Sequence, residues 1–162
     1  MTQIPYNVYP VRIIVNAQSS PFSYGKPSLY YVYPMTQITS FHIVAEKHIQ
    51  FLENKYNVQR VDENAFINFI PTMQAPTQAP TILHPVMYLL EKAISRFRRG
   101  VYNELVGFDV CDSDRMSEYA TFFLNLMDKV AVPSSYCKSV YERSGVRSKV
   151  YWIPHGLDKE WY

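Results

Sequence analysis

Short apolar runs alternate along the chain with longer segments in which apolar residues recur at helical spacing. Residues 11–15 (VRIIV) are rich in β-branched residues, as in a strand that is buried on both faces of a sheet. Five further runs predict short strands, at residues 58–61, 66–70, 104–110, 129–132 and 150–153.

Three segments carry apolar residues at steps of three and four, which predicts amphipathic helices over residues 38–52, 86–97 and 116–127. A fourth helix is predicted after residue 134, with Ser134 or Ser135 as its N-cap and Gly145 as a left-handed residue after its end. Its inner face would hold Cys137, Val140 and Tyr141.

The second of these helices ends in a basic group, Arg96, Arg98 and Arg99, followed by Gly100. Cations suit the negative end of a helix dipole, and a glycine suits the residue after the last turn. The alternative is that the arginines contact an anionic membrane surface or a phosphate-bearing acceptor.

Two segments rich in proline are predicted as loops. Residues 17–35 combine Pro, Ser and Tyr, and residues 71–81 read PTMQAPTQAPT. Proline cannot occupy the interior of a helix or a central strand, so the second segment is predicted to be a surface connector. A loop that faces an acceptor is the alternative.

The alternation of strands and helices predicts an α/β fold. We expect a Rossmann-like three-layer domain, with helices on both faces of a mostly parallel sheet of about six strands. The length of 162 residues fits one domain, and 48% apolar with 19% charged residues is ordinary for a globular protein.

Charge and cysteine content narrow the function classes. A net charge of +2 gives no reason to expect a nucleic-acid partner. Cys111 and Cys137, with four scattered histidines, offer too few grouped ligands for a metal site. The start MTQIPYNVYP has neither the basic nor the apolar part of a signal peptide, and no run is long enough to span a membrane. We therefore expect a cytoplasmic protein with reduced thiols.

Open parallel sheets bind ligands beyond the carboxyl ends of their strands, and this rule selects the candidate site residues. They follow four of the predicted strands: Ser23, Tyr24, Gly25, Asp112, Asp114, Arg115, Ser134, His155 and Gly156. Structural roles compete at each position. Asp112, Ser113, Asp114 or Ser134 could cap a helix, and Gly25 or His155 could serve a turn.

Several catalytic signatures are absent from the sequence. It contains no G-x-G-x-x-G, no G-x-x-x-x-G-K-[ST] and no G-x-S-x-G, which disfavours a dinucleotide oxidoreductase, a P-loop nucleotidase and an α/β-hydrolase. Paired acidic residues after residues 11–15 are also missing, which disfavours a receiver-like domain.

Residues 128–158 read DKVAVPSSYCKSVYERSGVRSKVYWIPHGLD. Their order and spacing resemble the end of the N-terminal domain in GT-B glycosyltransferases of the family-4 kind, where a strand, P-S, a helix, S-G-V, a strand and P-x-G-(V/L/I)-D follow one another. The matched residues are Val130, Pro133, Ser134, Ser144, Gly145, Val146, Val150, Ile153, Pro154, His155, Gly156, Leu157 and Asp158. Upstream, Leu124, Asn125 and Asp128 are similar to an L-N-x-x-D of one branch of that family. Before residue 100 only the α/β order agrees.

The resemblance implies that residues 1–154 form the acceptor-side domain of a glycosyltransferase of the hexosyltransferase type. Such an enzyme moves a sugar from a nucleotide-sugar donor to an acceptor hydroxyl, with retention at the anomeric carbon and without a bound metal or other cofactor. It implies that residues 155–162 begin the interdomain linker. The donor-binding C-terminal domain is then expected in cis or in trans, because this sequence ends at Tyr162, and the chain alone is expected to be inactive.

The resemblance also suggests roles for the site residues. Asp112 or Asp114 is expected to act in catalysis by orienting the acceptor hydroxyl or the donor sugar. Residues 23–25 would approach the phosphates, and His155 with Gly156 would lie at the hinge. The alternative function is a non-catalytic binding or assembly module that keeps the half-fold, in which an exposed apolar face would favour a homo-oligomer. Peripheral contact with a membrane, through a lipid-linked acceptor, is left open.

Overall fold

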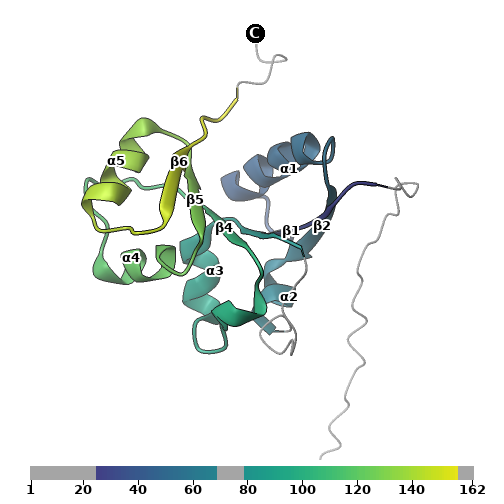
Figure 1. Cartoon of the computed structure of the whole chain (residues 1–162), viewed down its shortest axis with the longest axis horizontal. Helices are drawn as coiled ribbons and strands as arrows, with labels where there is room; N and C mark the ends of the chain where they lie inside the picture. The colour runs from purple at the N-terminus through teal and green to yellow at the C-terminus, as the bar shows by residue number, and fades with distance from the viewer. Residues whose placement is uncertain (1–24, 69–78, 157–162) are drawn as a thin grey trace, which may run out of the picture.

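The computed structural model describes residues 25–68 and 79–156 (Figure 1). Within these ranges the chain forms an α/β domain of the Rossmann-like three-layer type, with one six-stranded sheet in which every pairing is parallel. The elements, in chain order, are β1 (Ser28–Tyr33), α1 (Ser40–Leu52), β2 (Asn57–Asp62), α2 (Glu63–Asn68), β3 (Thr81–Leu83), α3 (Val86–Ala93), the 3-10 turn η2 (Arg99–Val101), β4 (Leu105–Phe108), α4 (Glu118–Leu124), β5 (Lys129–Val132), α5 (Ser135–Arg143) and β6 (Lys149–Trp152).

The sheet separates two hydrophobic clusters, because successive strand residues point to opposite faces. Leu29, Tyr31 and Tyr33 of β1 pack with Ala45 and Ile49 of α1 on one face. The larger cluster lies on the other face, where the alternate residues of the central strands meet α2, α3, α4 and α5. Figure 1 shows α1 and α3 on opposite sides of the sheet.

Polar residues cap three of the helices at their starts. The side chains of Thr39, Ser117 and Ser134 accept hydrogen bonds from the third backbone amide of α1, α4 and α5. Ser134 is therefore the cap of α5, as predicted. Gly145 follows α5 with φ +90°, the left-handed backbone that was expected there.

Four predicted strands are confirmed, one of them (β5) at the predicted bounds and the other three with ends shifted by one or two residues. They are β2, β4, β5 and β6. The predicted inner face of α5 is confirmed too, since Cys137, Val140 and Tyr141 are buried. The strand predicted at residues 11–15, like most of the loop predicted at 71–81, lies outside the described residues.

The loop predicted over residues 17–35 is wrong in its second half, which forms β1, an interior strand of the sheet between β2 and β3. Pro27 and Pro34 stand just outside the strand, so neither removes an amide from the β ladder. Between them SLYYVY is aromatic and β-branched, a composition that suits a buried strand.

The strand predicted at residues 66–70 is also wrong, because Phe66 lies in helix α2. The carboxylate of Asp62 accepts a hydrogen bond of 2.9 Å from the backbone amide of Asn64, which favours the helical turn that follows β2. The sixth strand is instead β3, whose three residues TIL pair with β1 and β4.

Helix α3 ends at Ala93, earlier than its apolar stripe suggested. Gly100 lies inside η2 and has no positive φ, so the prediction that it ends the helix is wrong. Arg99 instead forms an ion pair with Asp128, which also accepts the amide hydrogen of Leu105 at 2.7 Å. No helix within the described ranges is long and apolar enough to cross a membrane.

Gly107 in β4 permits the close approach of α3 to the sheet. A Cβ at this position would lie 2.5 Å from Cγ2 of Val86 and 3.0 Å from Cγ of Met127. Both neighbours belong to the buried core, so glycine is required here for space.

Candidate functional site

The order of the strands fixes where this sheet can bind a ligand. The order β2-β1-β3-β4-β5-β6 reverses direction between β1 and β3, which makes their carboxyl ends the topological switch point. Open α/β sheets bind ligands in the crevice at such a point. His84 directly follows β3 and therefore lies at this position.

Three imidazoles form a column beside the switch point, which we call the histidine column: His84, His48 of α1, and His155 after β6. The ring of His48 stacks on the ring of His84, with a centroid distance of 5.7 Å, and on the ring of His155, with a centroid distance of 6.0 Å. Phe108, the last residue of β4, contacts all three rings at centroid distances of 4.6 to 5.6 Å. The column runs from buried His84 through half-buried His48 to exposed His155.

The hydroxyl of Tyr31 joins two members of the column. Its oxygen lies 2.9 Å from Nδ1 of His48 and 3.0 Å from Nδ1 of His84. A phenol has one hydrogen, so it donates to one of these nitrogens and accepts from the other. When both rings are neutral, His48 and His84 must therefore be in opposite tautomers.

The environment favours the uncharged forms of these residues. Burial, with repulsion from His155, lowers the pKa of His48 to about 4. Burial, with repulsion from His48 and His155, lowers the pKa of His84 to about 3. Burial also raises the pKa of Tyr31 well above its usual value, and Tyr33 adds to the shift. Neutral side chains that hold defined hydrogens suit hydrogen bonding to hydroxyl groups.

Asp109 fixes the backbone around His84. It follows β4, is 4% exposed, and accepts amide hydrogens of Met87 and Val110 at 2.8 Å each. Burial raises the pKa of Asp109 to about 6, although these amide hydrogen bonds oppose the shift. The carboxylate thus ties the end of β4 to the first turn of α3, which directly follows His84 and Pro85.

Of the predicted site residues, His155 is the one that joins the column. Gly156 is exposed next to it. The hydroxyl of Ser134 accepts the amide hydrogen of Cys137 at 3.0 Å, so its observed role is to cap α5.

The predicted acidic residues separate from one another, because residues 111–116 run along α5. Sγ of Cys137, in the first turn of α5, lies 3.6 Å from the carbonyl oxygen of Cys111. Arg143, in the last turn, donates from Nε and a terminal nitrogen to the carbonyl oxygen of Asp114 at 3.1 and 2.7 Å. Those two turns are about 9 Å apart along the helix axis. Asp112 therefore stays near the carboxyl edge, and Asp114 does not.

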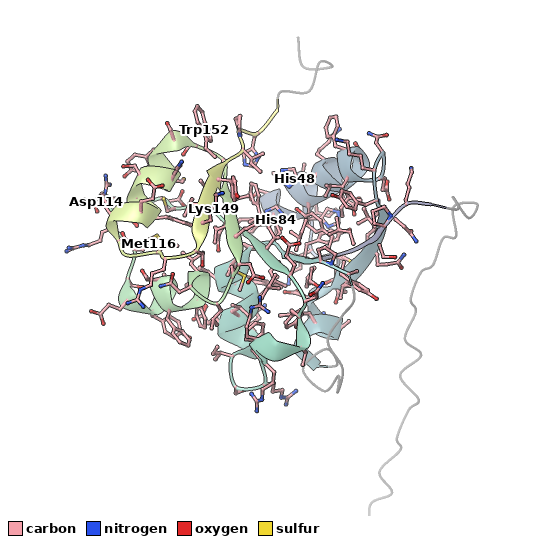
Figure 2. All side chains as sticks on the ribbon, in the orientation of Figure 1. His48, His84, Asp114, Met116, Lys149 and Trp152 are labelled. Atoms are coloured by element: carbon pink, nitrogen blue, oxygen red, sulfur yellow. The ribbon has the colours of Figure 1, made fainter. Side chains whose placement is uncertain are left out.

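The expectation that all these polar residues gather at one edge thus fails for Asp114 and Arg115. Figure 2 shows Asp114 well away from His48 and His84. None of Asp112, Ser113 and Asp114 is the cap of α4, because Ser117 fills that role.

The predicted phosphate-side loop is also displaced. Gly25, with φ +122°, precedes β1 and therefore lies at the amino end of the sheet, opposite the switch point. The earlier expectation rested on a strand before Gly25, and the observed central strand comes after it. Ser23 and Tyr24 lie outside the described residues.

Tyr31, His48 and His84 were not predicted as site residues. A signal for His84 exists in the sequence, since a polar residue follows the short apolar run TIL before a proline. Tyr31 and His48 carry no comparable signal, because only the folded sheet brings them together. Within the described part of the chain, no group of three or more His, Cys, Asp or Glu residues is arranged to hold a metal ion.

No family model matches the chain. The chain is similar to "Uncharacterized protein 356" of Sulfolobus islandicus rod-shaped virus 1, with 27% identity over 138 residues. The match covers 80% of this chain and 37% of that protein, so the chain spans little more than a third of the length of this relative. The similarity provides a viral relative and leaves the function to be argued from the site.

Proposed function

We propose that the chain is the acceptor-side domain of a glycosyltransferase that uses a nucleotide-sugar donor, with its site at the carboxyl edge beside β1 and β3. One observation carries the proposal. His155, from the P-H-G-L-D segment that resembles the glycosyltransferase hinge, stacks on His48 and contacts Phe108 next to the switch point. A sequence motif and an independent rule about sheet topology therefore select the same place.

The chemistry of this edge suits a hydroxylated ligand. Sugar hydroxyls both donate and accept hydrogen bonds, and His48 and His84 offer neutral imidazoles that Tyr31 holds in opposite tautomers. In the proposed reaction the bond from the anomeric carbon to the diphosphate oxygen breaks as the acceptor oxygen bonds to that carbon. The acceptor proton passes to the departing diphosphate. The residues of this chain bind and orient the acceptor, and the donor would be held by a further domain.

Asp112 keeps its predicted role within the proposal, and Asp114 does not. Asp112 is exposed and adjoins Cys111, which contacts the first turn of α5 at the carboxyl edge. In the proposal its carboxylate accepts a hydrogen bond from an acceptor hydroxyl. The two aspartates thus provide a matched pair for mutagenesis.

The test uses the full-length product of the gene with radiolabelled UDP- and GDP-sugars and extracts of the source organism as acceptors. We expect label transfer by the wild type, and a loss of about tenfold or more in His155→Ala and Asp112→Asn. Asp114→Asn, the matched control, should retain transfer. A folded protein that transfers none of the sugars would refute the proposal.

A second candidate, a non-catalytic assembly module, is favoured by the edge strand β6. Trp152 and Ile153 are 55% and 50% exposed there, and one side of β6 has no strand neighbour within the described residues. Light scattering of the purified chain discriminates the two. A dimer lost on Trp152→Ser with no sugar transfer would favour the module.

A further inference from the structure

A groove between α4 and α5 lies apart from the histidine column. It is open to solvent, has a volume of about 620 Å³, and is lined by residues of both helices and of the segments that flank them. Met116 is among its lining residues, and Figure 2 shows Met116 well to one side of His48 and His84. The groove is therefore separate from the site proposed above.

Hydrogen bonds between the segments that flank the two helices hold the groove together. Ser144 accepts the amide hydrogen of Met116 at 2.9 Å, and the amide nitrogen of the Asn125 side chain donates to the carbonyl of Gly145 at 3.3 Å. The oxygen of the same Asn125 side chain accepts the amide hydrogen of Arg147 at 2.5 Å. These bonds define the shape of the groove before any ligand binds.

Three guanidinium groups line this groove: those of Arg115, Arg143 and Arg147. Arg143 donates to a neutral carbonyl, that of Asp114. Within the described residues no hydrogen bond or ion pair engages the guanidinium of Arg115 or that of Arg147. Glu118 is the one carboxylate among the lining residues, so the lining carries a net positive charge of about two.

An aromatic surface adjoins the arginines. Phe122 lines the groove and is 52% exposed, and the guanidinium carbon of Arg143 lies 5.9 Å above the ring of Tyr136. Guanidinium groups bind phosphate oxygens in pairs of parallel hydrogen bonds, and an exposed ring offers contact to the non-phosphate part of a ligand.

We propose that the α4–α5 groove is an anion site that takes a phosphate-bearing group, with Arg115 and Arg147 as its principal ligands. The phosphate can belong to a free phosphorylated molecule or to a lipid headgroup, since both present the same oxygens. A concave groove whose shape is held by hydrogen bonds suits one bound phosphate group better than a flat charged surface does. This site does not depend on the proposed glycosyl transfer.

The test titrates the 162-residue chain with inorganic pyrophosphate, and separately with phosphatidylcholine vesicles with and without phosphatidic acid. Arginine Nε resonances report the first titration and vesicle co-sedimentation the second. We expect Arg115→Gln/Arg147→Gln to weaken binding by about tenfold or more. Lys55→Gln/Arg98→Gln, which removes two exposed charges elsewhere, should bind within about twofold of the wild type.

The outcomes separate the two sources of phosphate. Binding of pyrophosphate alone assigns the groove to a free phosphorylated molecule, and binding of acidic vesicles alone assigns it to a headgroup. Equal weakening in both double variants would show that net charge alone is responsible, which overturns the proposal. So would the absence of binding to either probe by the wild type.

Discussion

Protonation of His84 should couple the stability of the fold to pH. His84 is 1% exposed, and burial lowers its pKa to about 3, whereas a histidine in the unfolded chain titrates at its ordinary pKa of about 6.5. Below about pH 6.5 the unfolded chain therefore binds a proton that the folded chain does not. The contribution of His84 to stability is thus present near neutral pH and is lost as the pH falls from about 6.5 toward 3.

The size of this loss follows from the difference in protonation. Each unit of pKa difference changes the free energy of unfolding by about 1.4 kcal/mol. A pH of about 5 is about 1.5 units below the pKa of the unfolded histidine, so His84 should lower the free energy of unfolding by about 2 kcal/mol at that pH. Asp109 acts in the opposite direction. Its pKa is raised to about 6 in the folded chain, so its protonation should raise the free energy of unfolding by about 1 kcal/mol at the same pH.

His84→Asn isolates the histidine from the aspartate. The amide of asparagine reaches the place of Nδ1 and keeps a hydrogen bond to Tyr31 without titrating. Urea unfolding, followed by circular dichroism at about pH 7.5 and about pH 5, should show an acid-induced loss about 2 kcal/mol smaller in the variant than in the wild type. His42→Asn, outside the column, controls for removal of a histidine. Equal reductions in both variants, or none in His84→Asn, would refute the reasoning.

Three further predictions concern single contacts and are checked by urea unfolding at neutral pH. Gly107→Ala should cost about 1–3 kcal/mol, because its Cβ would meet Val86 and Met127, and Val86→Ala should cost less in that variant than in the wild type. Ser134→Ala should cost about 1 kcal/mol by removing the cap of α5, whereas Ser134→Asp should cost little. Tyr31→Phe should cost about 1–3 kcal/mol, because it leaves both imidazole nitrogens without their shared partner. A loss below about 0.5 kcal/mol in any of the three would contradict the contact assigned to it.

Local sequence chemistry predicted the second half of the sheet well. β5 (KVAV) and β6 (KVYW) are short runs of valine with other apolar residues, and α5 between them has a serine cap at Ser134 and a glycine, Gly145, after its end. Each of these signals acts over a few residues, so it survives whatever the distant packing is. The α/β class followed from the alternation of such signals.

The first half of the sheet was harder because tertiary packing decides it. β1 lies between two prolines, and three-residue β3 is too short to show a period. The apolar side chain of Phe66 fits either a strand or a helix. Phe66 lies in α2, where it packs in the larger buried cluster, and this packing is not visible in the local sequence.

The candidate site shows the same limit. The rule about strand ends selected His155, which joins the column. The rule says only where a connecting segment begins, however, and residues 111–116 then run away from the edge along α5. The column combines residues 48, 84 and 155, whose neighbourhood depends on the strand order and on the side of the sheet that α1 covers. No local pattern contains that information.

The motif residues and the histidine column have different roles: the first stabilise the fold, and the second forms the candidate site. Several residues that carry the family resemblance have structural tasks: Ser134 caps α5, Gly145 turns the chain, and Asp128 anchors the start of β4. The resemblance is therefore strongest where backbone geometry restricts the sequence. Two of the three imidazoles, with the tyrosine that joins them, come instead from before residue 100, where only the α/β order is shared. If this edge binds an acceptor, its specificity is then encoded mainly in that first half of the chain.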